Sequence, residues 1–299
     1  MTTPYITPSV LTSAGQFRVA WNTIPTIGAT SEAQQQEQLN ICQRASADVN
    51  GIVNQVLAAT FNLETFIGPD FDLAVYGTSA LRAMTTNTPI IGVYGGQWQF
   101  IGATNWIAIN PNQTINPSPP YNGMDFSNAG YGENGVIITG LPTDALNKTF
   151  MVQLALVSGY PHTQSTEALV AGATTITVAD VTGWNGLTGE IRDGVNSEPI
   201  TVSSVTASAN AYGVLTGAGT LNLASPLINA HITNTLVSTL PRNIEKATLY
   251  LAVAEALSGG TTAIAVPPAK GSTTGGGSNL LTMYRKEARE LLKPFMRVL

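Results

Sequence analysis

The chain has 299 residues, which is enough for one large domain or two ordinary ones. Charged residues make up only 10%, and the formal net charge is −5, so the sequence lacks the basic character of a protein that reads nucleic-acid sequence. The charge is uneven, with a net −8 over residues 61–240 and a net +4 over residues 241–299. An acidic middle and a basic end favour complementary partners, or contact with each other.

The single cysteine, Cys42, excludes a disulfide framework or a thiolate metal site within one chain. It falls at an apolar position of a predicted helix, which favours a buried structural thiol over a nucleophile. The first ten residues lack the basic start and apolar core of a secretory signal. No run approaches the roughly 18 apolar residues of a membrane span, so we expect no membrane association.

Residues 1–29 are mixed in character and are expected to be extended. A helix is predicted over residues 30–60, because Ser31 followed by Gln34 matches a capping box and apolar residues then recur at three- and four-residue steps. That apolar stripe consists of Cys42, Ala45, Val49, Ile52, Val53, Val56 and Thr60. Gly51 lies mid-helix, where glycine costs roughly 1 kcal/mol relative to alanine. Either it permits close approach of another backbone, or it is tolerated.

The opposite face of this helix is rich in amides and poor in charge. It carries Gln35, Gln36, Gln38, Asn40, Gln43, Asn50, Asn54 and Gln55. Such a face is either exposed to solvent or packed against another polar surface. Gln36, Gln43 and Asn54 are our candidate partner-interface residues on it.

From residue 63 the sequence changes to short β-branched and aromatic runs broken by glycine and proline, which is typical of strands. Asn-Gly and Asp-Gly pairs, which favour hairpin turns, begin at positions 122, 134, 185 and 193. We therefore expect a β-rich unit over residues 63–240, either single or divided into about 63–160 and 161–240. The predicted strands fall in 63–77, 88–109, 135–140, 150–160, 173–181, 198–205, 219–225 and 235–240.

Helical periodicity returns after Leu240-Pro241 and ends at Gly259-Gly260, two positions that suit a helix start and stop. Residues 258–279 read as a flexible connector or an extended loop. A last helix is predicted over residues 279–293 with an apolar stripe and a charged face. The candidate partner-interface residues at this end are Arg285, Arg289, Lys293 and Arg297, and the alternative is a solvated helix face.

These elements predict an α+β fold. Residues 1–62 and 241–299 would form a helical platform from both chain ends, because packing their apolar stripes on each other buries them most simply. The large β-rich unit over 63–240, sandwich-like or barrel-like, would be inserted between them.

A search for chemistry predicts no catalytic residue, metal site or cofactor. His162 and His231 lack the spacing of a metal-binding or nucleophile motif and are interpreted as hydrogen-bonded structural residues. Asp70 and Asp72 form a DxD pair without the further ligands of a calcium loop. Trp98 and Trp106 suggest either a carbohydrate- or protein-binding surface or core aromatics, and we prefer the core.

Several segments, taken in chain order, resemble the head–tail connector (adaptor) proteins of tailed bacteriophages. They include the first predicted helix, a Gly-Tyr-Pro at 159–161 and the C-terminal helix. The segments that carry the resemblance are 41–57, 88–93 with Trp106, 159–161, 171–178, 198–202, 225–231 and 287–298. Those of 171–231 resemble a small β module that recurs in phage structural proteins.

The resemblance implies a non-enzymatic virion protein of the neck, made in the cytoplasm of the host bacterium. Such a subunit forms a dodecameric ring beneath the portal protein, contacts a tail, stopper or terminator protein, and lets double-stranded DNA pass. An alternative function is a β-rich tail or capsid-surface protein that binds a glycan or a protein through Trp98 and Trp106. A hydrolase built around His162 or His231 is the third hypothesis.

Overall fold

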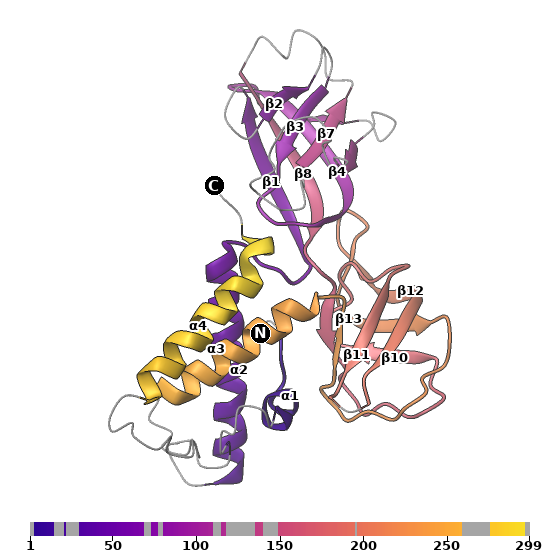
Figure 1. Cartoon of the computed structure of the whole chain (residues 1–299). Helices are drawn as coiled ribbons and strands as arrows, with labels where there is room; N and C mark the ends of the chain where they lie inside the picture. Colours follow the sequence, from indigo (N-terminus) through magenta and orange to yellow (C-terminus); the bar gives the residue numbers. More distant parts are fainter. Residues whose placement is uncertain are drawn as a thin grey trace.

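The computed structural model describes residues 3–14, 21, 30–68, 73–76, 80–109, 115–117, 135–139, 149–194, 196–258 and 276–296. The fold is a mixture of helices and sheets. Figure 1 shows a group of helices and two separate groups of strands, one above the helices in this view and one beside them.

The N-terminal segment contains a short helix, α1 (Pro8–Ser13), where the sequence led us to expect an extended chain. Its start is defined by Thr7, whose hydroxyl accepts a hydrogen bond from the N–H of Val10. The expectation of an extended chain was therefore wrong for residues 8–13, because six residues are too few to show helical periodicity.

Helix α2 (Ser31–Val53) begins where predicted but ends earlier. Thr30 is the N-cap and accepts from the N–H of Ala33, so the cap lies one residue before the predicted one. Asn54 adopts a left-handed conformation (φ 56°) that ends the helix. The extension to Thr60 was therefore wrong, because the chain turns here to enter the first strand.

The helices share one hydrophobic core. Helices α3 (Arg242–Ser258) and α4 (Gly276–Leu292) lie close to their predicted positions, and the short 3-10 helix η4 (Lys293–Phe295) follows. The rings of Tyr250 and Tyr284 stack between α3 and α4, with centroids 5.7 Å apart. Buried core residues come from all four α-helices, among them Leu11, Ile41, Cys42, Val49, Ile244, Ala252, Ala288 and Leu292.

The first group of strands consists of two sheets whose inner faces share a core. One sheet has the order β1-β8-β4-β5 and the other β2-β3-β7-β6, and all neighbours are antiparallel. Their core joins Trp98 and Leu154 of one sheet to Val136 of the other. The strands are β1 (Thr60–Gly68), β2 (Leu73–Tyr76), β3 (Ala80–Met84), β4 (Ile90–Phe100), β5 (Ile107–Ala108), β6 (Ile115–Pro117), β7 (Gly135–Thr139) and β8 (Phe150–Ser158).

The second group forms a six-stranded sheet in the order β10-β13-β12-β11-β14-β9. A bridge between Ser165 and Val178 brings its two edges together, so the sheet is nearly closed and barrel-like. Its core surrounds the fully buried Trp184. The strands are β9 (His162–Gln164), β10 (Thr175–Val178), β11 (Thr188–Arg192), β12 (Glu198–Ala209), β13 (Leu215–Leu223) and β14 (Leu236–Ser238).

The predicted turns at Gly186 and Gly194 lie between strands of this sheet, and both glycines have positive φ angles. The Asn-Gly pair at 122–123 lies outside the described residues.

The three parts of the molecule meet at Gly159, directly after β8. Ala58 and Tyr160 form a parallel bridge, and Gly159 has a φ of +101°. A Cβ at this position would lie 2.6 Å from the carbonyl oxygen of Ala58, so only glycine lets the two chain segments pass. Strand β1 begins at Thr60, a few residues before the predicted change to β structure at 63.

Within the described ranges, no helix is both long enough and apolar enough to span a lipid bilayer.

Candidate functional site

The candidate residues of the C-terminal helix lie on its exposed face. Arg285, Arg289 and Lys293 are all exposed, and Lys293 Nζ pairs with Glu290 Oε2 at 2.6 Å. Burial, together with Glu255, raises the pKa of Asp48 on α2, while the charges of Arg285 and Arg44 act in the opposite direction. The face is thus a surface of mixed sign with a basic excess. Arg297 lies outside the described residues.

The amide-rich face of α2 is divided between surface and interior. Gln36 and Asn54 are exposed and Gln43 is half-buried. With Asn40, Ala47 and Gly51 they form an uncharged line along the helix at three- and four-residue steps, which we call the α2 stripe. Gln36 donates to Asn40 across one turn at 3.0 Å. A Cβ on Gly51 would meet nothing within 4 Å, so no other backbone approaches it closely.

Three amides that the sequence placed on this polar face instead hold the parts of the molecule together. Gln38 is buried and donates to the carbonyl of Trp21. Asn50 accepts from the hydroxyl of Tyr5 at 2.6 Å. Gln55, also buried, accepts from the N–H and hydroxyl of Thr88 and donates to the carbonyl of Phe295. Of the two interpretations of this face, packing against other polar groups therefore holds for these three amides, whose partners lie elsewhere in the sequence.

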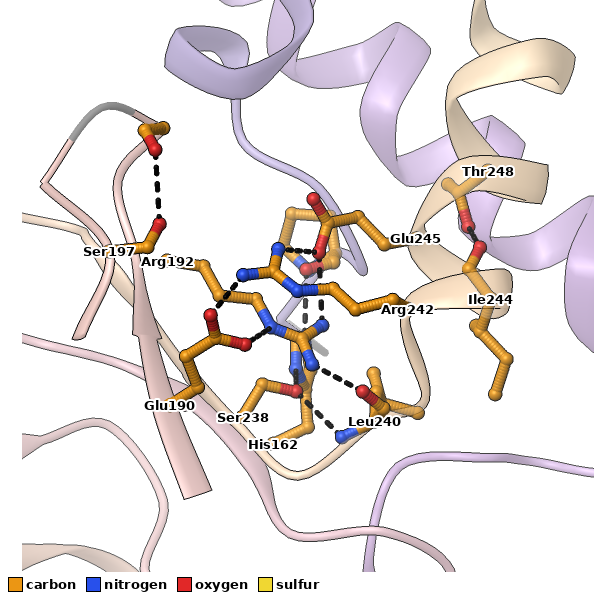
Figure 2. A network of polar contacts seen from close by, with 12 residues as sticks. His162, Glu190, Arg192, Ser197, Ser238, Leu240, Arg242, Ile244, Glu245 and Thr248 are labelled. Carbon is orange, nitrogen blue, oxygen red and sulfur yellow. Dashed lines mark hydrogen bonds and ion pairs between the residues drawn. The ribbon is translucent and has the colours of Figure 1, made fainter. Parts of the chain in front are cut away.

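A network of charged residues joins the second group of strands to the start of α3 (Figure 2). Arg192 of β11 is only 4% exposed, and its guanidinium lies 3.4 Å from Glu190 and 3.1 Å from Glu245. It also donates to the carbonyl of Leu240, and the more exposed Arg242 pairs with both glutamates. Burial lowers the pKa of Arg192, although the two glutamates act against this. The positive charges of the two arginines are neutralised by the negative charges of the two glutamates. We call Glu190, Arg192, Arg242 and Glu245 the charged joint.

His162 lies beside this network and is buried. Its Nδ1 is 2.8 Å from the hydroxyl of Ser238, and its Nε2 is 2.9 Å from the carbonyl oxygen of Pro4. Because a carbonyl only accepts, Nε2 carries the proton and Nδ1 accepts from Ser238. Burial lowers the pKa of His162 to about 4, and the nearby charge of Arg192 contributes. The ring is therefore neutral and structural.

His231 lies in a second buried network beneath the loops of the six-stranded sheet. Its Nδ1 is 2.6 Å from Asp193 Oδ2, and its Nε2 is 2.7 Å from Glu198 Oε1. A carboxylate oxygen therefore lies within hydrogen-bond distance of each ring nitrogen. Burial raises the pKa of Glu198, but hydrogen bonds from the N–H groups of Ile228 and Asn229 and from His231 lower it overall.

Both histidines are thus hydrogen-bonded, buried residues, as the sequence suggested. Cys42 is fully buried and its pKa is raised to about 12 by burial, as expected of a structural thiol. Trp98 packs edge-on against Phe100 in the core of the first group, which confirms a core role for this residue, whereas Trp106 is only half-buried. Among the described residues, no group of three or more His, Cys, Asp or Glu side chains is placed to hold a metal ion.

A groove of about 610 Å³ lies between the helices and the second group of strands. Its walls come from α1, from the first turns of α2 and from residues 232–235, and Gln36 of the α2 stripe is part of the wall. Most of the lining residues carry a hydroxyl or a side-chain amide, and Glu32, Arg192 and Asp193 are the charged ones. Of these, Arg192 and Asp193 are already paired within the protein.

Comparisons with protein-family models, curated proteins and solved structures found no match to this chain. The candidate site therefore rests on the geometry alone. Sequence reasoning missed the charged joint of Glu190, Arg192, Arg242 and Glu245, because isolated charges on a strand and a helix carry no spacing signal.

Proposed function

We propose that this chain is a head–tail connector (adaptor) protein of a tailed bacteriophage, a structural and non-enzymatic component of the virion neck. In this proposal it forms a homo-oligomeric ring, with twelve copies, beneath the portal protein. The ring joins the capsid to a tail, stopper or terminator protein and lets double-stranded DNA pass during packaging and release.

The observation that carries the proposal is the common core of helices from the two ends of the chain. Leu11 and Val49 on one side of the sequence and Ile244 and Ala288 on the other belong to one buried cluster. This supports a helical platform from which the strand groups project.

Contact between copies is assigned to the α2 stripe. Its exposed or half-buried residues are uncharged, so identical subunits can approach along it without repulsion between like charges. Ala47 and Gly51 present little side-chain bulk, which suits a neighbouring backbone.

Contact with the portal is assigned to the basic side of α4. Arg285 and Arg289 of α4 and Lys293 at the start of η4 are exposed and present a charged surface that an acidic portal face would complement. The acidic excess of residues 61–240, a net −8 in each copy, would repel DNA phosphates and let DNA slide through the ring without sticking.

The test is electron microscopy of the protein mixed with a portal ring from the same genome. We expect an additional ring stacked on the portal with matching rotational symmetry. Reversing the charges of Arg285, Arg289 and Lys293 to glutamate should abolish stacking, whereas the exposed Lys246→Glu on α3 serves as a matched control. A protein that stays monomeric and ignores the portal would overturn the proposal and favour the tail or capsid-surface binding protein.

A further inference from the structure

Two adjacent loops expose the most accessible large apolar side chains among the described residues. Val170 is 67%, Ile228 76% and Ile232 60% exposed. We call these three residues the apolar loop patch. The segments that carry them, 168–173 and 224–235, contain no Asp, Glu, Lys or Arg. An exposed apolar surface without charge is typical of a contact site rather than of a solvated loop.

Backbone hydrogen bonds hold the two loops side by side. Leu169 and His231 exchange N–H···O bonds of 2.8 and 2.9 Å, and the N–H of Gly172 donates to the carbonyl of Leu227 at 2.8 Å. Leu169, Leu227 and His231 point inward and are buried. Because side chains alternate along such a ribbon, the residues that follow each of them point outward, and the patch is contiguous.

The buried network around His231 fixes these loops from below. Glu198 accepts from the N–H groups of Ile228 and Asn229 at 2.7 and 2.9 Å, and the ring of His231 is held between Glu198 and Asp193. The patch is thus presented by a preorganised scaffold, so a partner that covers it loses little free energy to ordering the loops.

The charge and the position of the apolar loop patch indicate which kind of partner covers it. The six-stranded sheet and its loops, residues 162–238, carry five acidic residues against one arginine, a net −4, which disfavours nucleic acid and anionic lipid. Ile232 of the patch and Gln36 of the α2 stripe line the same groove, so one neighbouring surface that enters this groove would reach both. We propose that the apolar loop patch is covered by a neighbouring copy of this chain, as part of the same contact; this rests on the ring of the proposed function.

The test replaces Val170, Ile228 and Ile232 together by serine and measures the mass of the assembly by sedimentation and mass photometry. We expect the variant to need at least about tenfold more protein than the wild type to assemble. Ile107→Ser is the matched control, because Ile107 is 50% exposed but lies on β5 in the first group of strands. The side chains are exposed, so both variants should keep the wild-type circular dichroism and melting temperature.

Four outcomes are distinguishable. Weakened assembly of the triple variant alone supports the inference. Equal assembly of the wild type and the triple variant overturns it and leaves the ring intact. Weakening by Ile107→Ser to the same extent also overturns it, because the effect is then not specific to the patch. A wild type that never assembles, alone or on a portal ring, removes the proposed function and the inference together, and cosedimentation with phosphatidylcholine vesicles would then assign the patch to a lipid surface.

Discussion

The two buried histidines have different hydrogen-bond partners, and this difference separates the two regions in which they lie. His162, at the joint between the helices and the six-stranded sheet, contacts a hydroxyl and a carbonyl and is neutral. His231, beneath the exposed loops, is held between two carboxylates. At the joint the charged groups are Arg192 and its glutamates, which lie next to the histidine, whereas under the loops two carboxylates contact the histidine directly. One residue type therefore serves two different kinds of buried polar cluster.

The largest effect is expected at the joint. Arg192→Met should destabilise the protein by about 3–5 kcal/mol. The substitution removes the buried positive charge that pairs with Glu190 and Glu245, and it removes the hydrogen bond to the carbonyl of Leu240. Urea denaturation followed by tryptophan fluorescence measures this loss. A change below about 1 kcal/mol would mean that Arg242 alone satisfies both glutamates.

The next effect is a pH dependence that comes from the joint. His162 has a pKa of about 4 in the folded chain against 6.5 for the unfolded residue. Below pH 6.5 the unfolded chain takes up a proton that the folded chain does not, so stability is present above this pH and falls as the pH drops towards 4. The loss reaches about 3 kcal/mol.

Melting temperatures measured between pH 7 and pH 4 test this dependence. His162→Gln should remove most of the slope in this window. A variant with the wild-type slope would show that the proton uptake belongs to other groups.

A smaller effect is expected under the loops. Glu198→Gln should cost about 2 kcal/mol, because it removes the negative charge that accepts from His231 and from two backbone N–H groups. Thermal melting measures the loss. Glu167→Gln is the control, because Glu167 is exposed and lies in the loop between β9 and β10. An equal loss in both variants would contradict a special role for the buried carboxylate.

The smallest effect is expected on the solvent side of the joint. Arg242→Gln should cost less than about 1 kcal/mol, because Arg242 is exposed and water screens its pairs with Glu190 and Glu245. Measured beside Arg192→Met, it separates the buried half of the network from the exposed half. A loss as large as that of Arg192→Met would show that the four charges act as a single unit.

The sequence predicted what depends on local pattern. The positions of α3 and α4, most strands and the turns at Gly186 and Gly194 follow from periodicity and turn chemistry. Helix α1 was not predicted because six residues are too few to show helical periodicity. The end of α2 at Asn54 was missed because apolar residues continue past it.

The hydrogen bonds between buried polar residues could not be predicted from the sequence, because they join residues that are far apart along the chain. Gln55 bonds Thr88 and Phe295, and His162 bonds Pro4, across separations of 33, 240 and 158 residues. The candidate surface residues Gln36, Arg285 and Arg289 are exposed, but exposure alone does not identify a partner. Their role stays a prediction that the experiments with a portal ring test.

The chain enters and leaves the six-stranded sheet at neighbouring strands, and this has a consequence for how the protein can evolve. Its first strand and its last strand are direct neighbours, with Ser238 opposite His162. A unit whose two ends lie side by side can be gained, lost or exchanged in one genetic event, since a short link then closes the gap it leaves. The helices and the first group of strands can therefore be kept while this sheet is lost or replaced by another.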